Sequence, residues 1–308
     1  MKKIVIALAA LALTAGMASA QDINAALETY NNAIALSDTD KAAALDGLKE
    51  ALKAGEALGD EGFELVENCK SAIPALTLSL AKSQINEGEY DAALETLAAA
   101  DSIAKEYGNE EIPEDVKELT VNVYSRRGSK LYSEKKWEEA LVDLTKVIEA
   151  KPDDAKTLVK VAVANQGLGK MDEALEAYKL AAENGMAKQV NPRISNIYKK
   201  KAQEAQKAGK IADAVEALAA SAEYLPDAGT FKTIGNLYSK LGKFTDANGA
   251  YEKYLEMSPT APDADGVKYT IAVNAQKLGD KVTAKEYYGQ LLGNAEYAAE
   301  AKKQLGAL

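Results

Sequence analysis

Apolar and small residues recur along most of the chain at intervals of three or four positions, the spacing of amphipathic helices, and short polar turns interrupt them. Six of these turns have a common form: a turn residue, usually glycine, is followed two positions later by a residue that is usually bulky, and then by an alanine three positions further on. The six alanines are Ala93, Ala140, Ala174, Ala214, Ala247 and Ala284, separated by 47, 34, 40, 33 and 37 residues. A repeat of this length predicts a series of stacked helical hairpins.

Each residue of the pattern has a physical role in such a hairpin. Glycine can adopt a positive φ and so ends the first helix. The bulky residue and the alanine then lie on one face of the second helix, where the alanine lets two backbones approach closely. Another small residue stands twelve positions before each alanine, on the expected first helix: Ala81, Gly128, Ala162, Ala202, Gly235 and Ala272. Prolines twelve residues after three of the alanines are expected to end second helices: Pro152, Pro226 and Pro259.

These residues resemble the tetratricopeptide repeat family, over roughly residues 74–293. One unit matches that pattern nearly throughout: Phe231, Gly235, Tyr238, Gly242, Phe244, Ala247, Tyr251 and Pro259. A second matches at Tyr124, Gly128, Trp137, Ala140 and Pro152, and departs from it at Arg127 and Leu131. The resemblance implies an all-α, right-handed α-solenoid of stacked antiparallel helix hairpins that binds other proteins.

The remaining parts of the chain are less regular. We expect a signal peptide over residues 1–20, irregular N-terminal hairpins over 21–112, the repeat solenoid over 113–293, and a polar capping helix over 294–308. The N-terminal part predicts helices over 22–36 and 40–58. A further helix over 62–87 is either kinked at Pro74 or begins there. A loop over 108–113 is expected to follow.

The first residues have the form of a secretory signal. Lys2 and Lys3 precede an apolar run over residues 4–13, and Ala18-Ser19-Ala20 offers the small residues that a signal peptidase requires, so we expect cleavage after Ala20. The apolar run is too short to cross about 30 Å of hydrocarbon, which argues against a membrane anchor. No later segment is apolar enough to span a membrane. The chain is therefore expected to be exported, to a bacterial periplasm.

Composition narrows the classes of function. The chain has 308 residues, 37 basic and 47 acidic side chains, and no histidine. Removal of Lys2 and Lys3 leaves 35 bases against 47 acids, which argues against nucleic acid as a partner. Without histidine the chain lacks the commonest general base and metal ligand, so we expect no catalytic residues, no metal and no cofactor. A single Cys69 excludes an internal disulfide, and its apolar surroundings favour a buried thiol over a reactive one.

Charge is distributed unevenly between the two helices of each hairpin. In proteins that this chain resembles, the first helices of the hairpins line the concave side. If the residues of each repeat are numbered so that the small residue of the first helix is position 8, the positions that face the groove are 2, 5, 6, 9, 12 and 13. In five units these 30 positions include nine basic and no acidic residues, while acids gather on the second helices. A groove of this kind would attract an acidic or carboxylate-bearing segment. The alternative is that these lysines pair with acids on neighbouring helices.

The residues predicted to bind a partner are Arg126, Tyr132, Lys160, Lys199, Lys200, Gln203, Lys207, Lys232, Asn236, Lys240, Tyr269 and Lys277. The other repeat tyrosines are expected to be core residues rather than a ligand platform. The predicted function is a non-catalytic protein-interaction scaffold or adaptor of the periplasm or envelope that holds an acidic segment of another protein. A self-associating structural protein of the envelope is the alternative, in which the acidic outer side of one copy meets the basic groove of the next.

Overall fold

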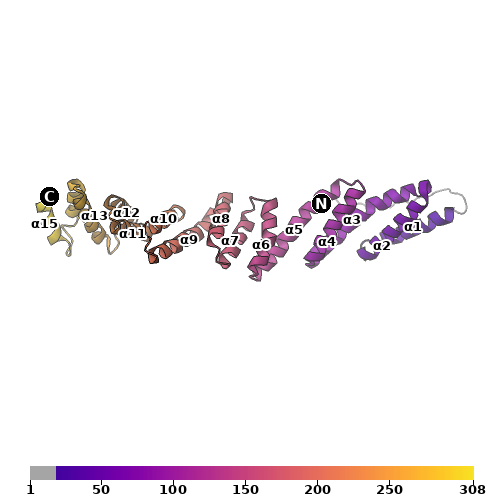
Figure 1. Cartoon of the computed structure of the whole chain (residues 1–308), viewed down its shortest axis with the longest axis horizontal. Helices are drawn as coiled ribbons and strands as arrows, with labels where there is room; N and C mark the ends of the chain where they lie inside the picture. Colours follow the sequence, from indigo (N-terminus) through magenta and orange to yellow (C-terminus); the bar gives the residue numbers. More distant parts are fainter. Residues whose placement is uncertain (1–18) are drawn as a thin grey trace. The chain divides into compact units, whose positions relative to one another are not determined.

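The computed structural model describes residues 19–308, which form helices joined by short turns and contain no strand (Figure 1). Residues 1–18 of the predicted signal peptide lie outside this range. The chain divides into two compact units, the first ending at Pro152 and the second running from Asp153 to Leu308. The boundary predicted between residues 112 and 113 lies within the first unit; it reflects the regularity of the repeats and stays a prediction.

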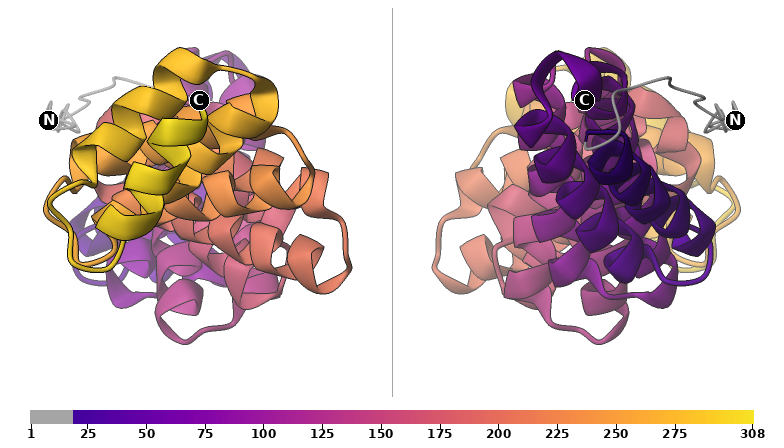
Figure 2. Two further views of the ribbon diagram at one scale, coloured as in Figure 1. Left: turned by 90° about the vertical axis from the view of Figure 1, so that its left-hand side faces the viewer. Right: turned by 90° about the vertical axis from the view of Figure 1, so that its right-hand side faces the viewer.

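The first unit contains α1 (Ser19–Leu36), α2 (Lys41–Ala57), a 3-10 turn (Gly59–Gly62), α3 (Phe63–Glu87), α4 (Tyr90–Glu106), α5 (Glu111–Ser133) and α6 (Trp137–Ala150). The second contains α7 (Ala155–Gly167), α8 (Met171–Ala181), a π-helical segment (Ala182–Met186), α9 (Ala187–Lys207), α10 (Ile211–Tyr224), α11 (Ala228–Lys240), α12 (Phe244–Met257), α13 (Ala264–Leu278), α14 (Lys281–Gln290) and α15 (Ala298–Ala307). Within each unit every α-helix packs against the next along the chain. Figure 2 shows the second unit from its C-terminal end and the first unit from its N-terminal end. The predicted all-α architecture of stacked antiparallel hairpins is confirmed, and its right-handedness stays a prediction.

The six repeat turns share one backbone geometry. Five of the turn residues are glycines with φ between 71° and 81°, and the sixth, Lys135, adopts the same left-handed conformation with φ 59°. In all six turns the next residue's N–H donates to the carbonyl five positions back, at 2.9–3.0 Å. This bond satisfies a carbonyl at the end of the first helix, and it requires the left-handed residue that glycine supplies most readily. The predicted helix ends are therefore set by local backbone chemistry.

The small residues of the repeat are the points at which helices touch. All six repeat alanines of the second helices are fully buried. A Cβ added to Gly235 of α11 would lie 2.5 Å from the ring of Tyr251 on α12, and one added to Gly128 of α5 would lie 3.0 Å from the Cβ of Asp143 on α6. The predicted close approach of first and second helices is confirmed at both positions.

Arg127, one of the two departures from the repeat pattern, forms a buried ion pair. Its Nε and Nη2 donate to the two carboxylate oxygens of Asp143, each at 2.7 Å, and its Nη1 bonds to Asp91 on α4. The Asp143 side chain is only 2% exposed, whereas that of Asp91 is 88% exposed. The hydrogen bonds to Asp143 raise the pKa of Arg127 above its ordinary value. One guanidinium thus links α4, α5 and α6.

The N-terminal helices confirm the prediction with two corrections. Helix α3 runs through Pro74 without a break, so the alternative that it begins at this residue is wrong. Helix α5 begins at Glu111, inside the expected loop over 108–113, because the side chain of Asn109 accepts the N–H groups of Glu111 and Ile112 at 3.0 Å. Asn109 thus caps the helix, and a proline is tolerated in the first turn that follows.

The thiol of Cys69 is buried in the core that α1, α2 and α3 share. The residue is 0% exposed, and desolvation raises the pKa of its thiol to about 12. Because the thiolate is the reactive form, both effects suppress its chemistry. The expectation of a buried structural thiol is confirmed.

We expect Gly235→Ala to lower the free energy of unfolding by about 2 kcal/mol, because the new methyl group would overlap the buried ring of Tyr251. Gly249→Ala on α12 is the control, since its Cβ would meet nothing within 4 Å, and it should raise stability by up to about 1 kcal/mol through helix propensity. Urea denaturation followed by circular dichroism measures both. Equal effects would show that Gly235 is not a point of close approach.

We expect Arg127→Leu to destabilise the protein by about 3 kcal/mol, because it leaves the buried carboxylate of Asp143 without a partner. Asp91→Asn, which removes the exposed partner of the same arginine, should cost less than about 1 kcal/mol. The same denaturation experiment compares them. A loss for Asp91→Asn as large as that for Arg127→Leu would contradict this assignment.

Candidate functional site

The twelve predicted partner-binding residues fall on first helices in both units. Arg126 and Tyr132 lie on α5 in the first unit, and Lys160 lies half-buried on α7 in the second. The other nine lie on α9, α11 and α13: Lys199, Lys200, Gln203, Lys207, Lys232, Asn236, Lys240, Tyr269 and Lys277. The second unit therefore carries most of the predicted groove.

Two of these lysines form ion pairs that connect neighbouring first helices. Lys199 Nζ on α9 lies 2.7 Å from Oδ2 of Asp227, the N-cap of α11, and Lys232 on α11 pairs with Asp263, the N-cap of α13. The two links occupy equivalent positions in successive hairpins, so α9, α11 and α13 stand in a row. Lys199 and Lys232 therefore pair with acids on neighbouring helices, which is the alternative to partner binding for the groove lysines.

The acids of these pairs are held in their charged form. Burial raises the pKa of Asp227, but hydrogen bonds from Lys199 and Thr230 outweigh it and leave this pKa below its ordinary value. Hydrogen bonds from Lys232 and Tyr254 likewise lower the pKa of Asp263. A depressed carboxylate pKa stabilises the fold at neutral pH, and this contribution is lost as the pH falls through the folded-state value.

The repeat tyrosines are core residues whose hydroxyls reach back to the first helix. Tyr178, Tyr251 and Tyr288 are buried and donate to Gln166, Asn236 and Gln276 at 3.1, 2.8 and 3.0 Å. Each bond joins a second helix to the first helix of its own hairpin. The expectation that these tyrosines form core rather than a ligand platform is confirmed, and Asn236 is held by one of them.

Both aromatic residues predicted for the groove are packed against other rings. Tyr132 is half-buried and meets Trp137 edge-on, with ring centroids 5.6 Å apart. Tyr269 stacks on Tyr297, which precedes the capping helix α15, with centroids 5.3 Å apart. Tyr269 is half-buried and packs against the terminal core, and its role in binding a partner stays a prediction. Lys277 is exposed, and its Nζ lies 4.8 Å from the ring centroid of Phe244.

Four polar side chains of the predicted groove in the second unit are exposed and are not held by other side chains. Lys200, Gln203 and Lys207 on α9 and Lys240 on α11 form no side-chain hydrogen bond or ion pair within residues 19–308. We call Lys200, Lys207 and Lys240 the lysine set. The acids that begin α11 and α13, Asp227 and Asp263, are paired with Lys199 and Lys232. Glu204 on α9 is exposed and forms no ion pair within residues 19–308, so it offsets one of the three charges of the lysine set and leaves a net positive charge.

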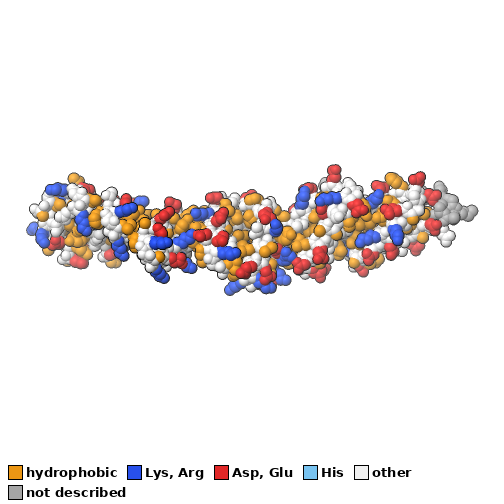
Figure 3. Space-filling view, viewed as in Figure 1, with side chains coloured by type: hydrophobic (Ala, Val, Ile, Leu, Met, Phe, Trp, Pro, Cys, Tyr) orange, Lys and Arg blue, Asp and Glu red, His pale blue; other side chains and the backbone are white. Residues whose placement is uncertain are grey.

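Arg126 occupies a different setting. It is exposed and lines a pocket of about 290 Å³ between α3 and α5, with Lys82 and Glu118 among its neighbours. Helix α5 is longer than an ordinary first helix and begins at Glu111. Glu118 therefore lies on α5 before the first of the 30 groove positions and is not among them. The visible face of the molecule likewise carries both signs of charge (Figure 3). The segregation of charge is therefore local to the first helices of the second unit.

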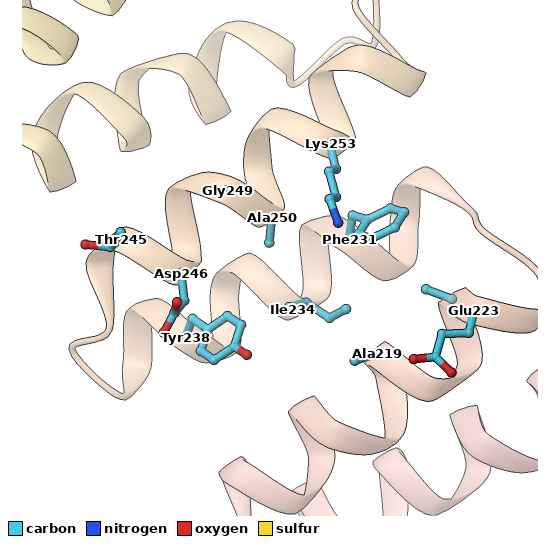
Figure 4. Close-up of a pocket in the computed structure, with 11 residues that line it drawn as sticks. Ala219, Glu223, Phe231, Ile234, Tyr238, Thr245, Asp246, Gly249, Ala250 and Lys253 are labelled. Atoms are coloured by element: carbon cyan, nitrogen blue, oxygen red, sulfur yellow. The ribbon is translucent and has the colours of Figure 1, made fainter.

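A second pocket, which the sequence did not indicate, lies between the second helices α10 and α12 with α11 at its floor (Figure 4). It encloses about 530 Å³. Its lining residues are Ala219, Ala222, Glu223, Phe231, Ile234, Tyr238, Thr245, Asp246, Gly249, Ala250 and Lys253. The small residues that α10 and α12 turn toward each other leave this space open, and they are the only signal in the sequence that could have predicted it.

No group of three or more acidic or cysteine side chains within residues 19–308 is placed to hold a metal ion. Among the helices of that range, none combines the length and apolar character needed to cross a membrane.

Comparison with known proteins adds a likeness in fold. No family model and no curated protein matches the chain. Solved structures do match. MamA is 20% identical over 58% of this chain and 94% of that one, with a TM-score of 0.30. PilW, a widely conserved type IV pilus biogenesis factor, is 19% identical over 76% of this chain and 98% of that one, with a TM-score of 0.32. A thermophilic TPR protein of Thermus thermophilus is a third (19%, 61% and 97%, TM-score 0.27). The chain is similar to tetratricopeptide-repeat proteins. TM-scores near 0.3 carry no conclusion about what it binds.

We expect Asp227→Ala to cost about 1–2 kcal/mol, because it removes the N-cap of α11 as well as the link to α9. Lys199→Met, which removes only a half-exposed ion pair, should cost less than about 1 kcal/mol. Denaturation at several pH values measures both. The Asp227→Ala effect should shrink as the pH falls through the depressed pKa of Asp227. Equal costs for both variants would mean that the link, rather than the cap, dominates.

Proposed function

We propose that this chain is a non-catalytic protein-interaction scaffold whose first-helix row in the second unit holds an acidic or carboxylate-bearing segment of another protein. The observation that carries the proposal is the lysine set on α9 and α11, exposed and without an ion pair in the described chain, in a row where Asp227 and Asp263 are already paired. These three lysines outnumber Glu204, the exposed acid of α9 that has no ion pair within residues 19–308, and so produce a local positive field in an acidic protein.

Helix stability alone would account for part of this set. Lys207 and Lys240 stand in the last turns of α9 and α11, where a positive charge interacts favourably with the helix dipole. Lys200 lies further from the end of α9 and gains little from that effect, which is confined to the last turn. Lys200 is therefore the residue that best separates a binding role from a structural one.

The surrounding side chains suit an extended acidic segment. Lysines act as adaptable point charges, while Gln203 and Asn236 can hydrogen-bond to a backbone. Asn236 is oriented by Tyr251, so its amide nitrogen is free to donate. Affinity for such a partner should fall with rising salt, because the lysine set is exposed.

The location of the partner follows from the predicted signal peptide. A secretory signal over residues 1–20 would export the chain, so its partner would be another protein of the periplasm or envelope.

The test uses a fluorescein-labelled decaglutamate peptide, with binding followed by fluorescence anisotropy at low and high salt. The variant K200E/K207E/K240E should lose at least about tenfold in affinity, because three attractive charges become repulsive. The matched control K210E/K243E/K285E makes the same change of net charge at exposed lysines in turns and on α14, and should lose less than about threefold. Melting temperatures check that both variants fold.

Two results would contradict the proposal. Equal losses in the two triple variants would mean that net charge alone governs binding, and equal binding by wild type and K200E/K207E/K240E would mean that the lysine set is not used. Light scattering addresses self-assembly separately. If the wild type alone forms assemblies that dissolve at high salt, and the lysine-set variant does not, the alternative of a self-associating protein holds instead.

A further inference from the structure

The pocket between α10 and α12 combines an apolar floor with an acidic rim. Phe231 and Ile234 of α11 form the floor, and Ala219, Ala222 and Ala250 line the walls with little more than methyl groups. Its volume, about 530 Å³, lies in the ordinary range of ligand pockets and could admit a large side chain. Phe231 and Ile234 belong to hydrophobic clusters of the core, so the floor is held in place by packing.

Two carboxylates and a tyrosine hydroxyl lie around the pocket, and one of them, Glu223, also interacts electrostatically with Lys179 on α8. Figure 4 shows Tyr238 and Asp246 together at one end, while Glu223 enters from α10. The hydroxyl of Tyr238 and the carboxylates of Glu223 and Asp246 form no hydrogen bond or ion pair within residues 19–308. An acceptor-rich rim over an apolar floor is matched by a ligand that is apolar at its tip and positive at its flanks.

The charge on the two wall helices has the same sign. Helices α10 and α12 carry six acids, Asp213, Glu216, Glu223, Asp246, Glu252 and Glu256, and a single base, Lys253. Lys253 itself lies over the ring of Phe231, with Nζ 5.3 Å from the centroid (Figure 4). The one cation of these two helices therefore already sits where a cation is attracted by both the ring and the acidic rim.

The next hairpin repeats the pocket with a different floor. A cavity of about 400 Å³ between α12 and α14 is lined by Glu256, which is equivalent to Glu223, and by Lys268, which is equivalent to Phe231. Tyr287 replaces Ala250 and donates to Glu252 at 3.3 Å. The acidic rim thus continues along the second helices, whereas the apolar floor is confined to the first pocket.

We propose that this pocket binds a basic segment of a partner protein, with one bulky apolar side chain inserted over Phe231 and flanking lysines or arginines against Glu223 and Asp246. Insertion displaces Lys253 from the ring, and the flanking cations extend toward Glu252 and Glu256, further along α12, which line the cavity between α12 and α14. The site lies on the second helices and has the opposite charge preference to the lysine set on the first helices. It therefore goes beyond the proposed function and does not depend on it.

The test uses a fluorescein-labelled peptide, Gly-Lys-Arg-Phe-Lys-Arg-Gly, and two relatives, one with Phe replaced by Gly and one with its four basic residues replaced by Glu. Wild type should bind the first at least about tenfold more tightly than either relative by fluorescence anisotropy. Equal binding of the Phe and Gly peptides would overturn the proposal, because charge alone would then explain association.

Gly249→Trp should fill the pocket and reduce affinity for the Phe peptide at least about tenfold, since a side chain at this position meets open space. Gly289→Trp on α14 is the control, because it is also exposed and unobstructed but lines none of the pockets described above; it should change affinity less than about twofold. Unchanged binding by a folded Gly249→Trp variant would overturn the proposal.

A second pair of variants tests the rim without adding bulk. E223Q/D246N should weaken binding of the Phe peptide about threefold to tenfold, whereas E173Q/E176Q, the same loss of charge on α8, should change it less than about twofold. Equal losses would overturn the proposed site.

K200E/K207E/K240E should bind the Phe peptide at least as well as wild type, so failure here and failure of the proposed function are distinguishable. If the wild type dimerises and Gly249→Trp makes it monomeric, the occupant is a second copy and the proposal of a foreign basic segment fails.

Discussion

The close contact between the first and second helix of each hairpin is the constraint on which the rest of the structure depends. It requires a small residue on each helix, and Gly235 against Tyr251 shows that not even a methyl group fits at one of these points. It also requires a turn that reverses the chain within a few residues, which the left-handed turn residue and its backbone hydrogen bond provide. With both in place, a hairpin presents one apolar side to the next, and stacking buries a core that no hairpin could bury alone.

Polar side chains then join helices at defined places, both within a hairpin and between neighbouring hairpins. Arg127 connects three helices of the first unit, and the lysine–aspartate pairs connect successive first helices of the second. Ser195 and Ser221 bond at 2.8 Å between α9 and α10, and Asn248 and Asn274 bond at 3.0 Å between α12 and α13. Buried polar groups without partners are costly, so these pairs favour one register of stacking over its neighbours. The same pairs remove several charged residues from the set available to a ligand.

What remains for binding differs between the two sides of the second unit. The first helices retain the exposed lysine set, because Asp227 and Asp263 are paired with other lysines, Lys199 and Lys232, that join the stacked helices. The second helices α10 and α12 retain acids around an apolar pocket, because the alanines and the glycine on their facing sides are too small to fill the space over Phe231. With both proposed sites, the protein would hold two segments of opposite charge at once.

The amino-acid sequence by itself determined the helices, the turns between them and the order in which they stack, because hydrophobic periodicity and left-handed turn geometry act over a few neighbouring residues. It also indicated that the lysines gather on first helices. Only the tertiary structure decided that Lys199 pairs with Asp227, 28 positions away, that Tyr269 is covered by Tyr297, and that a pocket opens between α10 and α12. Those outcomes depend on the distance and rotation between helices of different hairpins. Many side chains set that geometry jointly, and no local pattern encodes it.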